Sequence, residues 1–361
     1  MAYTTIDDPS ANFTTTLWTG AGGSPRAITN DANSGNFQPD FVWTKGRNEA
    51  YEHNLYDSSR GTGTTKGLCS NDTSAEGTVS ASYGYLSSFD SNGFTGTAGS
   101  SGQNAYFDTN AKTYVAWQWK ANGGTTASNS NGSITSTVQA NTDAGFSIVT
   151  YTGTGSAATV GHGLGVTPDM IIFKNRSGAN VWATYHQSLG NNLKLELNGT
   201  GAQDADGAFM NGTLPTSSVF SVGASANTNT GSSNYVAYCF NNVQGYSKFG
   251  KYVGNGDANG PFVYTGFKPA FIMFKKSSDS GDNWMMYDNK RPGFNVTDQA
   301  LHPNSSAAEY DNANANLDIL SNGFKLRSSF GWVNQNTHTY IYMAFAENSF
   351  VTSTGIPTTA R

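Results

Sequence analysis

At 361 residues, the chain exceeds the roughly 250 to 300 residues at which single hydrophobic cores stop growing, so two or three domains are expected. Only 12% of the residues are charged, while 42 glycines and 13% aromatic residues are typical of short strands joined by polar turns and argue against a helical bundle. The net charge of -5 is spread thinly, so no basic surface would attract nucleic acid.

The chain begins with MAYTTIDDPS, which has neither the positive segment nor the apolar stretch of a signal peptide. No run approaches the roughly 18 apolar residues that a membrane-spanning helix needs. We therefore expect synthesis in a cytoplasm and no membrane insertion. Cys69 and Cys239 lie far apart, so we expect neither a disulfide framework nor a zinc site.

Three similar phrases recur along the chain: QPDFVWTKGR (38–47), TPDMIIFKNRS (167–177) and GFKPAFIMFKKSS (266–278). In each phrase a proline precedes a lysine by six residues, and the residues between them are mostly apolar or aromatic. The pairs are Pro39 with Lys45, Pro168 with Lys174, and Pro269 with Lys275. A short apolar run that follows a proline predicts a strand buried on both faces.

Other phrases keep the same spacing around these strands. A glycine cluster precedes each one, as LWTGAGG, TYTGTGS and KYVGNGD, and predicts a tight turn with positive φ. A tyrosine follows each lysine by 11 or 12 residues, and each copy closes with YVAW, YVAY or YMAF. The repeated unit is therefore a module of about 100 residues.

The repeats divide the chain into three predicted β modules at residues 1–121, 146–244 and 245–361. Residues 122–145 are rich in Ser, Thr, Asn and Gly and predict a flexible linker. Strand signals recur at intervals of roughly 8 to 12 residues, which predicts an all-β fold with an antiparallel β-sandwich or jelly roll in each module.

The residues offer little catalytic or metal-binding chemistry. The five histidines are scattered without metal spacing, no glycine cluster completes a phosphate loop, and DADG (204–207) lacks the glutamate that a calcium loop requires. Glycoside cleavage needs two facing carboxylates, and no spacing pairs the candidates Glu76, Glu196, Glu309 and Glu347. We expect no metal, no cofactor, no catalytic residues and no enzyme activity.

Aromatic and polar side chains near turns suggest a ligand surface instead. A tryptophan beside Asn, Asp or Thr on a β-sandwich can stack on a sugar ring while amides bind the hydroxyls. The candidate ligand-binding residues are Trp18, Trp182, Trp284, Tyr287 and Asp288. The alternative is that these residues pack in a core or in an interface.

Several longer phrases, including YTGTGSAATVGHGLGVTP, VQGYSKFGKYVGNGDANGPFVYTGFKPAFIMFKK and NGFKLRSS, resemble a family of virion proteins from marine tailed bacteriophages. The resemblance extends from TTIDDPSANFTTTLWTG to the final IPTTAR. That family contains repeated domains of unknown function and is commonly placed with tail or fibre-like proteins. The resemblance implies a structural or host-recognition role in the virion, with other virion proteins as partners.

Three functions follow as hypotheses. The first is a tail-associated or fibre-like adhesin that contributes to attachment to host-surface polysaccharide. The alternative is a capsid decoration or head-appendage protein with a purely structural role, and the third is a polysaccharide depolymerase. The first two imply a homo-oligomer, with the trimers of related tail fibres as the model, that is assembled in the host cytoplasm and then located in the virion.

Overall fold

The computed structural model describes residues 2–31, 36–78, 82–311 and 314–358. Their regular structure is almost entirely β-strand, apart from the 3-10 turn η1 (Pro9–Ala11) and the single helical turn α1 (Gly331–Asn334). Strands that neighbour each other in the described sheets run antiparallel. The predicted all-β, antiparallel fold is therefore confirmed. No helix within these ranges is long and apolar enough to cross a membrane.

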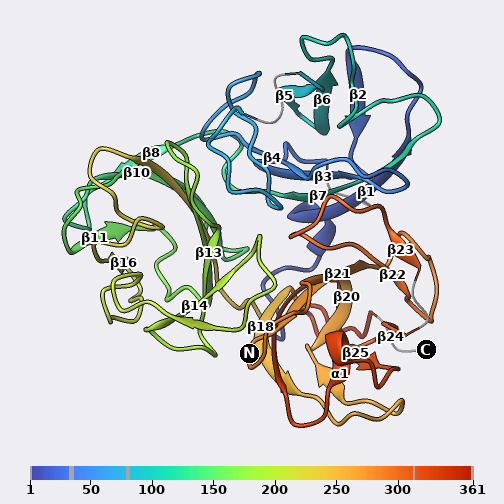
Figure 1. The fold of residues 1–361 in the computed structure, drawn as a ribbon. Coiled ribbons are helices and arrows are strands. Elements are labelled where there is room, and N and C mark those ends of the chain that lie inside the picture. Colours follow the sequence, from blue (N-terminus) through green and yellow to red (C-terminus); the bar gives the residue numbers. More distant parts are fainter. Residues whose placement is uncertain (1, 32–35, 79–81, 312–313, 359–361) are drawn as a thin grey trace.

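We refer to strands β1 to β7 with their loops as the first unit, β8 to β17 as the second unit and β18 to β26 as the third unit (Figure 1). In the first unit, a sheet of order β1-β7-β3-β4 lies against a sheet of order β2-β6-β5. The strands are β1 (Phe13–Thr19), β2 (Arg26–Thr29), β3 (Phe41–Gly46), β4 (Asn54–Asp57), β5 (Tyr85–Asp90), β6 (Gly93–Thr97) and β7 (Thr113–Trp119).

The second unit has an extended sheet of order β15-β14-β13-β12-β17-β10-β9-β8, against which the pair β11-β16 packs. Its strands are β8 (Ala127–Asn129), β9 (Ser136–Asn141), β10 (Phe146–Thr152), β11 (Ala158–Gly161), β12 (Met170–Asn175), β13 (Ala183–His186), β14 (Leu193–Glu196), β15 (Asp204–Ala205), β16 (Val219–Val222) and β17 (Asn234–Phe240).

The third unit pairs a sheet of order β18-β26-β20-β21 with a sheet of order β19-β25-β24, beside the short pair β22-β23. Its strands are β18 (Ser247–Val253), β19 (Phe262–Tyr264), β20 (Phe267–Lys276), β21 (Met285–Asp288), β22 (Gln299–Ala300), β23 (Tyr310–Asp311), β24 (Leu317–Leu320), β25 (Gly323–Leu326) and β26 (Thr339–Ser349).

The same strand order occurs in all three units: β1-β7-β3-β4, β10-β17-β12-β13 and β18-β26-β20-β21. The repeated proline-to-lysine phrase forms β3, β12 and β20, the interior strands of these sheets. Every residue of β3 and β12 is buried, as is every residue of β20 except Lys268. The prediction of strands buried on both faces is confirmed.

The segment at 122–145 is not the flexible linker that its composition predicted. Strands β8 and β9 form a hairpin, and β9 pairs with β10 from Thr137↔Thr150 to Asn141↔Phe146. Val138 is buried, and Ile134 forms a bridge with Val160 of β11. A polar segment can complete a sheet edge because the ladder uses backbone groups, and two apolar side chains fix its register.

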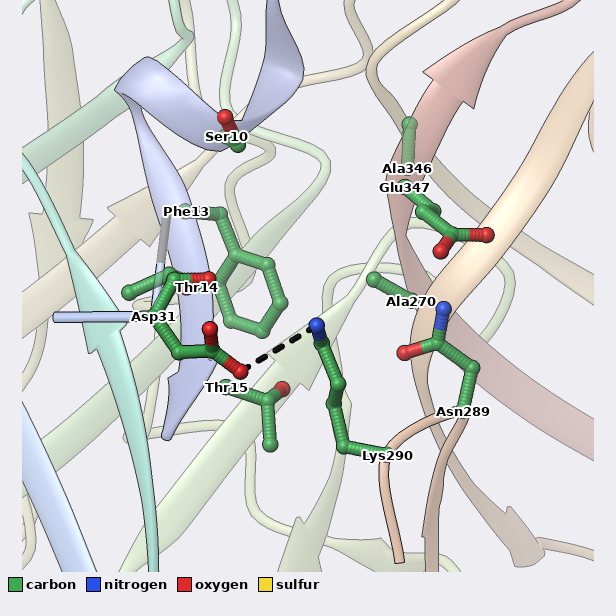
Figure 2. A pocket seen from close by; sticks show the side chains of 10 residues that line it. All are labelled: Ser10, Phe13, Thr14, Thr15, Asp31, Ala270, Asn289, Lys290, Ala346 and Glu347. Carbon is green, nitrogen blue, oxygen red and sulfur yellow. Dashed lines mark hydrogen bonds and ion pairs between the residues drawn. The ribbon is translucent and has the colours of Figure 1, made fainter. Parts of the chain in front are cut away.

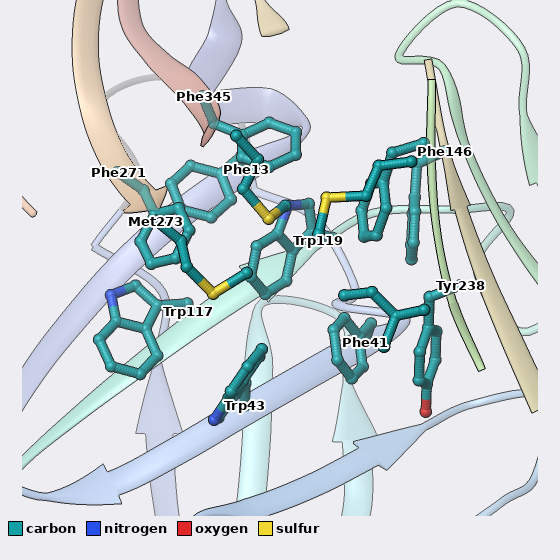
Figure 3. Close-up of a cluster of buried hydrophobic side chains, with 14 of the residues drawn as sticks. Phe13, Phe41, Trp43, Trp117, Trp119, Phe146, Tyr238, Phe271, Met273 and Phe345 are labelled. Carbon is teal, nitrogen blue, oxygen red and sulfur yellow. The ribbon is translucent and has the colours of Figure 1, made fainter. Parts of the chain in front are cut away.

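One hydrophobic core is shared by all three units (Figure 3). Phe41 of the first unit stacks on Tyr238 of the second, with ring centroids 4.3 Å apart. Phe13 of the first unit stacks on Phe345 of the third at 5.2 Å. The opposite face of each large sheet packs on the smaller sheet of its own unit. Each unit therefore buries one sheet face that would be an exposed apolar surface if the unit were alone.

The predicted boundaries at 121, 145 and 244 remain a prediction. The first residues of the chain, which the prediction assigns to the first module, contact the third unit. The hydroxyl of Tyr3 donates to the carbonyl of Gly266, 2.6 Å away, in the third unit. Asp7 accepts from the backbone N–H of Ser353 at 2.6 Å. Residues before β1 thus contact the third unit, although the boundary at 1–121 assigns them to the first.

The predicted glycine turns are confirmed by the backbone. In the second unit Gly155 has a φ of 76°, and a Cβ added at Gly153 would lie 2.3 Å from the carbonyl oxygen of Thr230. The first glycine of each pair permits a close backbone approach, and the second permits positive φ. The equivalent pairs are Gly20 with Gly22 and Gly254 with Gly256.

Replacing Gly153 with alanine should lower the free energy of unfolding by about 3 kcal/mol, because the new methyl group collides with backbone that cannot rotate away. The matched control is Gly201→Ala, where an added Cβ meets no heavy atom within 4 Å. Urea unfolding of both variants provides the measurement. Equal midpoints for the two variants would contradict the assigned close approach.

Candidate functional site

Two of the tryptophans expected to bind a ligand are buried where units meet. The indole N–H of Trp182 donates to the carbonyl of Cys69 in the first unit, at 2.7 Å. That of Trp284 donates to the carbonyl of Glu196 in the second unit, at 2.9 Å. His53 holds the equivalent place in the first unit, and its Nε2 lies 2.9 Å from the carbonyl oxygen of a third-unit residue, His302. The three contacts run head to tail and close a ring.

Tyr287 and Asp288 are fully buried as well. The Tyr287 hydroxyl donates to the carbonyl of Ala315. The Asp288 carboxylate accepts from the indole N–H of Trp117 in the first unit at 3.1 Å, and from Nε of Arg291 at 2.7 Å. Neither residue faces solvent.

Trp18 is the remaining candidate and is half-buried. Its indole N–H donates to the carbonyl of Phe107 at 2.6 Å, and its ring stacks on Tyr114 with centroids 5.2 Å apart. Trp182, Trp284, Tyr287 and Asp288 cannot form an exposed platform, because their side chains are buried. The structure therefore corrects their assignment as ligand contacts: Trp182, Trp284 and Asp288 join units, and Tyr287 packs in the core of the third unit.

Buried ion pairs repeat in the first and third units and were missed in the sequence. Asp57 pairs with Arg60 and accepts from the hydroxyl of Tyr238 in the second unit, at 2.7 Å. Asp288 and Arg291 repeat this arrangement, with an arginine three residues after the aspartate in both copies. That shared spacing is the pattern from which the pairs could have been predicted.

In the second unit, His186 replaces the aspartate and Leu189 stands where the arginine would be. The Nδ1 atom of His186 accepts from the backbone N–H of Ser188 at 3.1 Å, so its proton is on Nε2, 3.2 Å from the carbonyl oxygen of Tyr342. This position again contacts the following unit. Burial lowers the pKa of His186 to about 4.

The stability of the protein should therefore fall in acid. Above about pH 6.5 His186 is neutral in both states, whereas below it the unfolded chain takes up a proton that the native state accepts only near pH 4. The loss from this residue is about 3 kcal/mol at pH 4. Chemical denaturation at pH 7.5 and 4.5 measures the loss, and His186→Gln should reduce the difference between the two pH values by about 3 kcal/mol. Burial also lowers the pKa values of His53, His162 and His302, so part of the difference should remain. An unchanged pH dependence in that variant would contradict the assignment.

The repeated lysines are buried, and two of them, Lys174 and Lys275, reach a neighbouring unit. Nζ of Lys174 lies 3.0 Å from the carbonyl oxygen of Thr73 in the first unit, and Nζ of Lys275 lies 3.4 Å from that of Thr200 in the second. Burial lowers the pKa of Lys45 to about 7 and that of the other two lysines to about 8. Lys174 and Lys275 thus bind loop carbonyl oxygens of the preceding unit.

The acidic residues considered for glycoside cleavage all lie in ion pairs with basic side chains. The pairs are Glu76 with Arg60 and Arg176, Glu309 with Arg47 and Arg291, Glu196 with Lys194, and Glu347 with Lys268. Glu76 and Glu309 join units, because each binds one arginine from its own unit and one from a neighbour.

Figure 2 shows a hollow between the first and third units, crossed by the ion pair of Lys290 and Asp31 at 3.2 Å. Its volume is about 30 Å³, and its lining includes Phe13 and Ala270. A space of this size holds about one water molecule. It is a gap in the inter-unit contact and not a ligand site.

A more open groove in the first unit combines tyrosine rings with polar groups and has a volume of about 240 Å³. We call it the tyrosine groove. Its lining residues are Ala50, Tyr51, Glu52, Tyr83, Gln103, Ala105 and Tyr106. They come from the loop between β3 and β4, the loop before β5 and the loop between β6 and β7, so folding alone brings them together.

The walls of the tyrosine groove are held by packing. A Cβ added at Gly46, the last residue of β3, would lie 2.8 Å from the Tyr51 ring, so the glycine lets this ring lie against the strand. Tyr83 is 47% exposed, and its ring meets that of buried Tyr106 edge-on, with centroids 6.4 Å apart. The backbone N–H of Ala105 donates to the Tyr83 carbonyl at 2.7 Å and fixes the two loops together.

Two polar side chains, Glu52 and Gln103, belong to the lining of the tyrosine groove. Oε2 of Glu52 accepts from the side-chain amide of Asn71 and lies 3.7 Å from Sγ of Cys69. Oε1 accepts no hydrogen bond from the described residues. Gln103 is exposed. Aromatic rings beside a carboxylate and an amide form the combination that binds sugar rings and their hydroxyls.

A protein-family model matches residues 8–349, and its description is a domain of unknown function, DUF7483. The chain belongs to this family. No curated protein and no solved structure matches the chain. The range matched by DUF7483 includes η1 and ends with the last residue of β26. The family domain therefore contains all three units, in agreement with their shared core.

Proposed function

We propose that this protein is a structural component of a tailed-bacteriophage virion and contributes to attachment to host-surface polysaccharide. The resemblance of its repeated phrases to virion proteins of marine phages supports the virion location. An all-β body whose packed antiparallel sheets share one core suits a protein that holds loops in place as a binding surface. Other virion proteins and further copies of the chain are its partners in this proposal.

The observation that carries the attachment role is the tyrosine groove. The half-exposed ring of Tyr83 stands beside Glu52 and Gln103 in a space large enough for a sugar ring. A single site of this size binds weakly, and several copies on one particle would multiply the effect through their effective concentration.

Antibody-gold labelling of intact virions tests the location, and inhibition of phage adsorption by the purified protein tests attachment. Label on the tail together with blocked adsorption is the expected result. Unlabelled virions, or undiminished adsorption at saturating protein, would overturn the proposal.

A purely structural role on the capsid is the second candidate, and exposed apolar side chains in the third unit favour it. Phe294 is 81% exposed, and Phe262 and Tyr264 on the edge strand β19 are 45% and 56% exposed. Such groups suit contacts with neighbouring virion subunits. This role requires label spread over the head and a copy number set by capsid symmetry, measured by quantitative gel analysis of virions.

A further inference from the structure

We infer that the tyrosine groove binds a sugar ring that carries no acidic group and discriminates against uronic acids and other anionic sugars. The inference rests on the proposed attachment function and names the ligand class of the same site. It follows from the shape of the tyrosine groove, from its single charge and from the engagement of the cations around it.

The rings of the tyrosine groove accept the apolar face of a sugar. Tyr83 is the exposed ring, Tyr106 is 4% exposed and supports it edge-on, and Tyr51 is fixed by its contact with Gly46. Because these rings are held before a ligand arrives, little conformational entropy is lost when a sugar stacks on them.

Glu52 decides the charge preference. It is the one acidic or basic residue of the lining, and none of the described residues donates to its Oε1. A carboxylate oxygen only accepts hydrogen bonds. A sugar hydroxyl or ammonium group donates to this oxygen. A sugar carboxylate or sulfate would meet a like charge with no lysine or arginine among the lining residues to balance it.

The nearby cations are already engaged. Nζ of Lys45 is buried and donates to the carbonyl oxygens of Gly46 and Glu49, at 2.6 and 3.1 Å. Lys112 forms an ion pair with the carboxylate of Glu49. Recruiting either lysine for an anionic sugar would break contacts that hold the loop of Tyr51 and Glu52.

Calorimetric titration at low ionic strength, where charge effects are least screened, compares three probes of equal length. The probes are the neutral cellotetraose, the amine-bearing chitosan tetramer and tetragalacturonic acid. We expect the first two to bind at least tenfold more tightly than the acidic one. Equal or tighter binding of tetragalacturonic acid, or no binding of any probe at millimolar concentration, would overturn the inference.

Variants of the full chain locate the binding. Tyr83→Ala should weaken binding of the neutral probe at least fivefold, while Tyr264→Ala, which removes another half-exposed tyrosine in the third unit, should not. Glu52→Gln keeps an acceptor for Asn71 and should bring tetragalacturonic acid within threefold of cellotetraose. If the discrimination survives in Glu52→Gln, the carboxylate is not its cause and the inference fails.

The two proposals fail in different ways. Blocked phage adsorption by the wild type and by Tyr83→Ala alike would leave attachment standing and overturn the tyrosine groove as its site. Sugar binding that depends on Tyr83, without any effect on adsorption, would support the ligand class and overturn the role in attachment. Circular dichroism of each variant ensures that lost binding is not lost folding.

Discussion

Replacing Trp284 with alanine should lower the free energy of unfolding by about 3 to 5 kcal/mol. The side chain is 1% exposed, belongs to the core shared by the three units and donates to the carbonyl of Glu196. Truncation leaves a cavity at the contact of the second and third units and removes the indole hydrogen bond that joins them. Guanidinium unfolding followed by circular dichroism measures the loss.

Phe294→Ala is the matched control, because this ring is 81% exposed and its removal should change stability by less than about 0.5 kcal/mol. Similar small effects for both variants would mean that Trp284 lies at the surface, as a ligand platform would require. The comparison therefore also decides between the two interpretations of this tryptophan that the sequence left open.

Replacing Arg291 with leucine should lower the free energy of unfolding by about 3 to 5 kcal/mol relative to the wild type. Asp288 would remain buried without its cation, and Glu309 would lose one of its two arginines. Removal of one partner of a buried ion pair is costly because the other charge stays out of water. The midpoint of guanidinium unfolding at pH 7.5 provides the measurement.

The second unit supplies the control for this prediction. It carries His186 and Leu189 where the third unit carries Asp288 and Arg291. The double variant with Asp288→His and Arg291→Leu removes both charges and should recover at least half of the loss. If the double variant were as unstable as Arg291→Leu alone, the loss would not come from leaving the Asp288 carboxylate buried without its cation, and the prediction would be wrong.

The predictions for Trp284 and Arg291 concern contacts that belong to the head-to-tail ring of the three units. Each unit uses the same sequence position to reach a neighbour, so a change at one interface weakens a core to which all three units contribute. We therefore expect unfolding in one cooperative step, without stable intermediates that retain a single folded unit.

The regular part of the fold was accessible from the sequence. The proline-to-lysine phrases predicted the buried strands β3, β12 and β20, because a continuous apolar run cannot face water on either side. The glycine clusters predicted turns, because positive φ is costly for other residues. Composition failed at 122–145, where backbone pairing with β10 orders a polar segment that has few apolar side chains of its own.

The candidate site was not accessible in the same way. Tyr51 and Glu52 adjoin one repeated phrase and Tyr83 lies in a loop far from it, with no spacing to link them. Likewise, a buried tryptophan and an exposed one look alike in a sequence, since both occur near strand ends. Trp182 and Trp284 differ from an exposed tryptophan only because neighbouring units cover them.

By itself, the sequence determined the all-β class, the repeated strands and their turns, because these depend on local apolar runs and on the backbone freedom of glycine. Only the tertiary structure decided that the three units share one core, that the aspartate–arginine pairs and tryptophans join them, and that three tyrosines meet beside Glu52. Those features depend on which surfaces approach one another, and burial by a distant part of the chain leaves no periodic pattern in the residues that are buried.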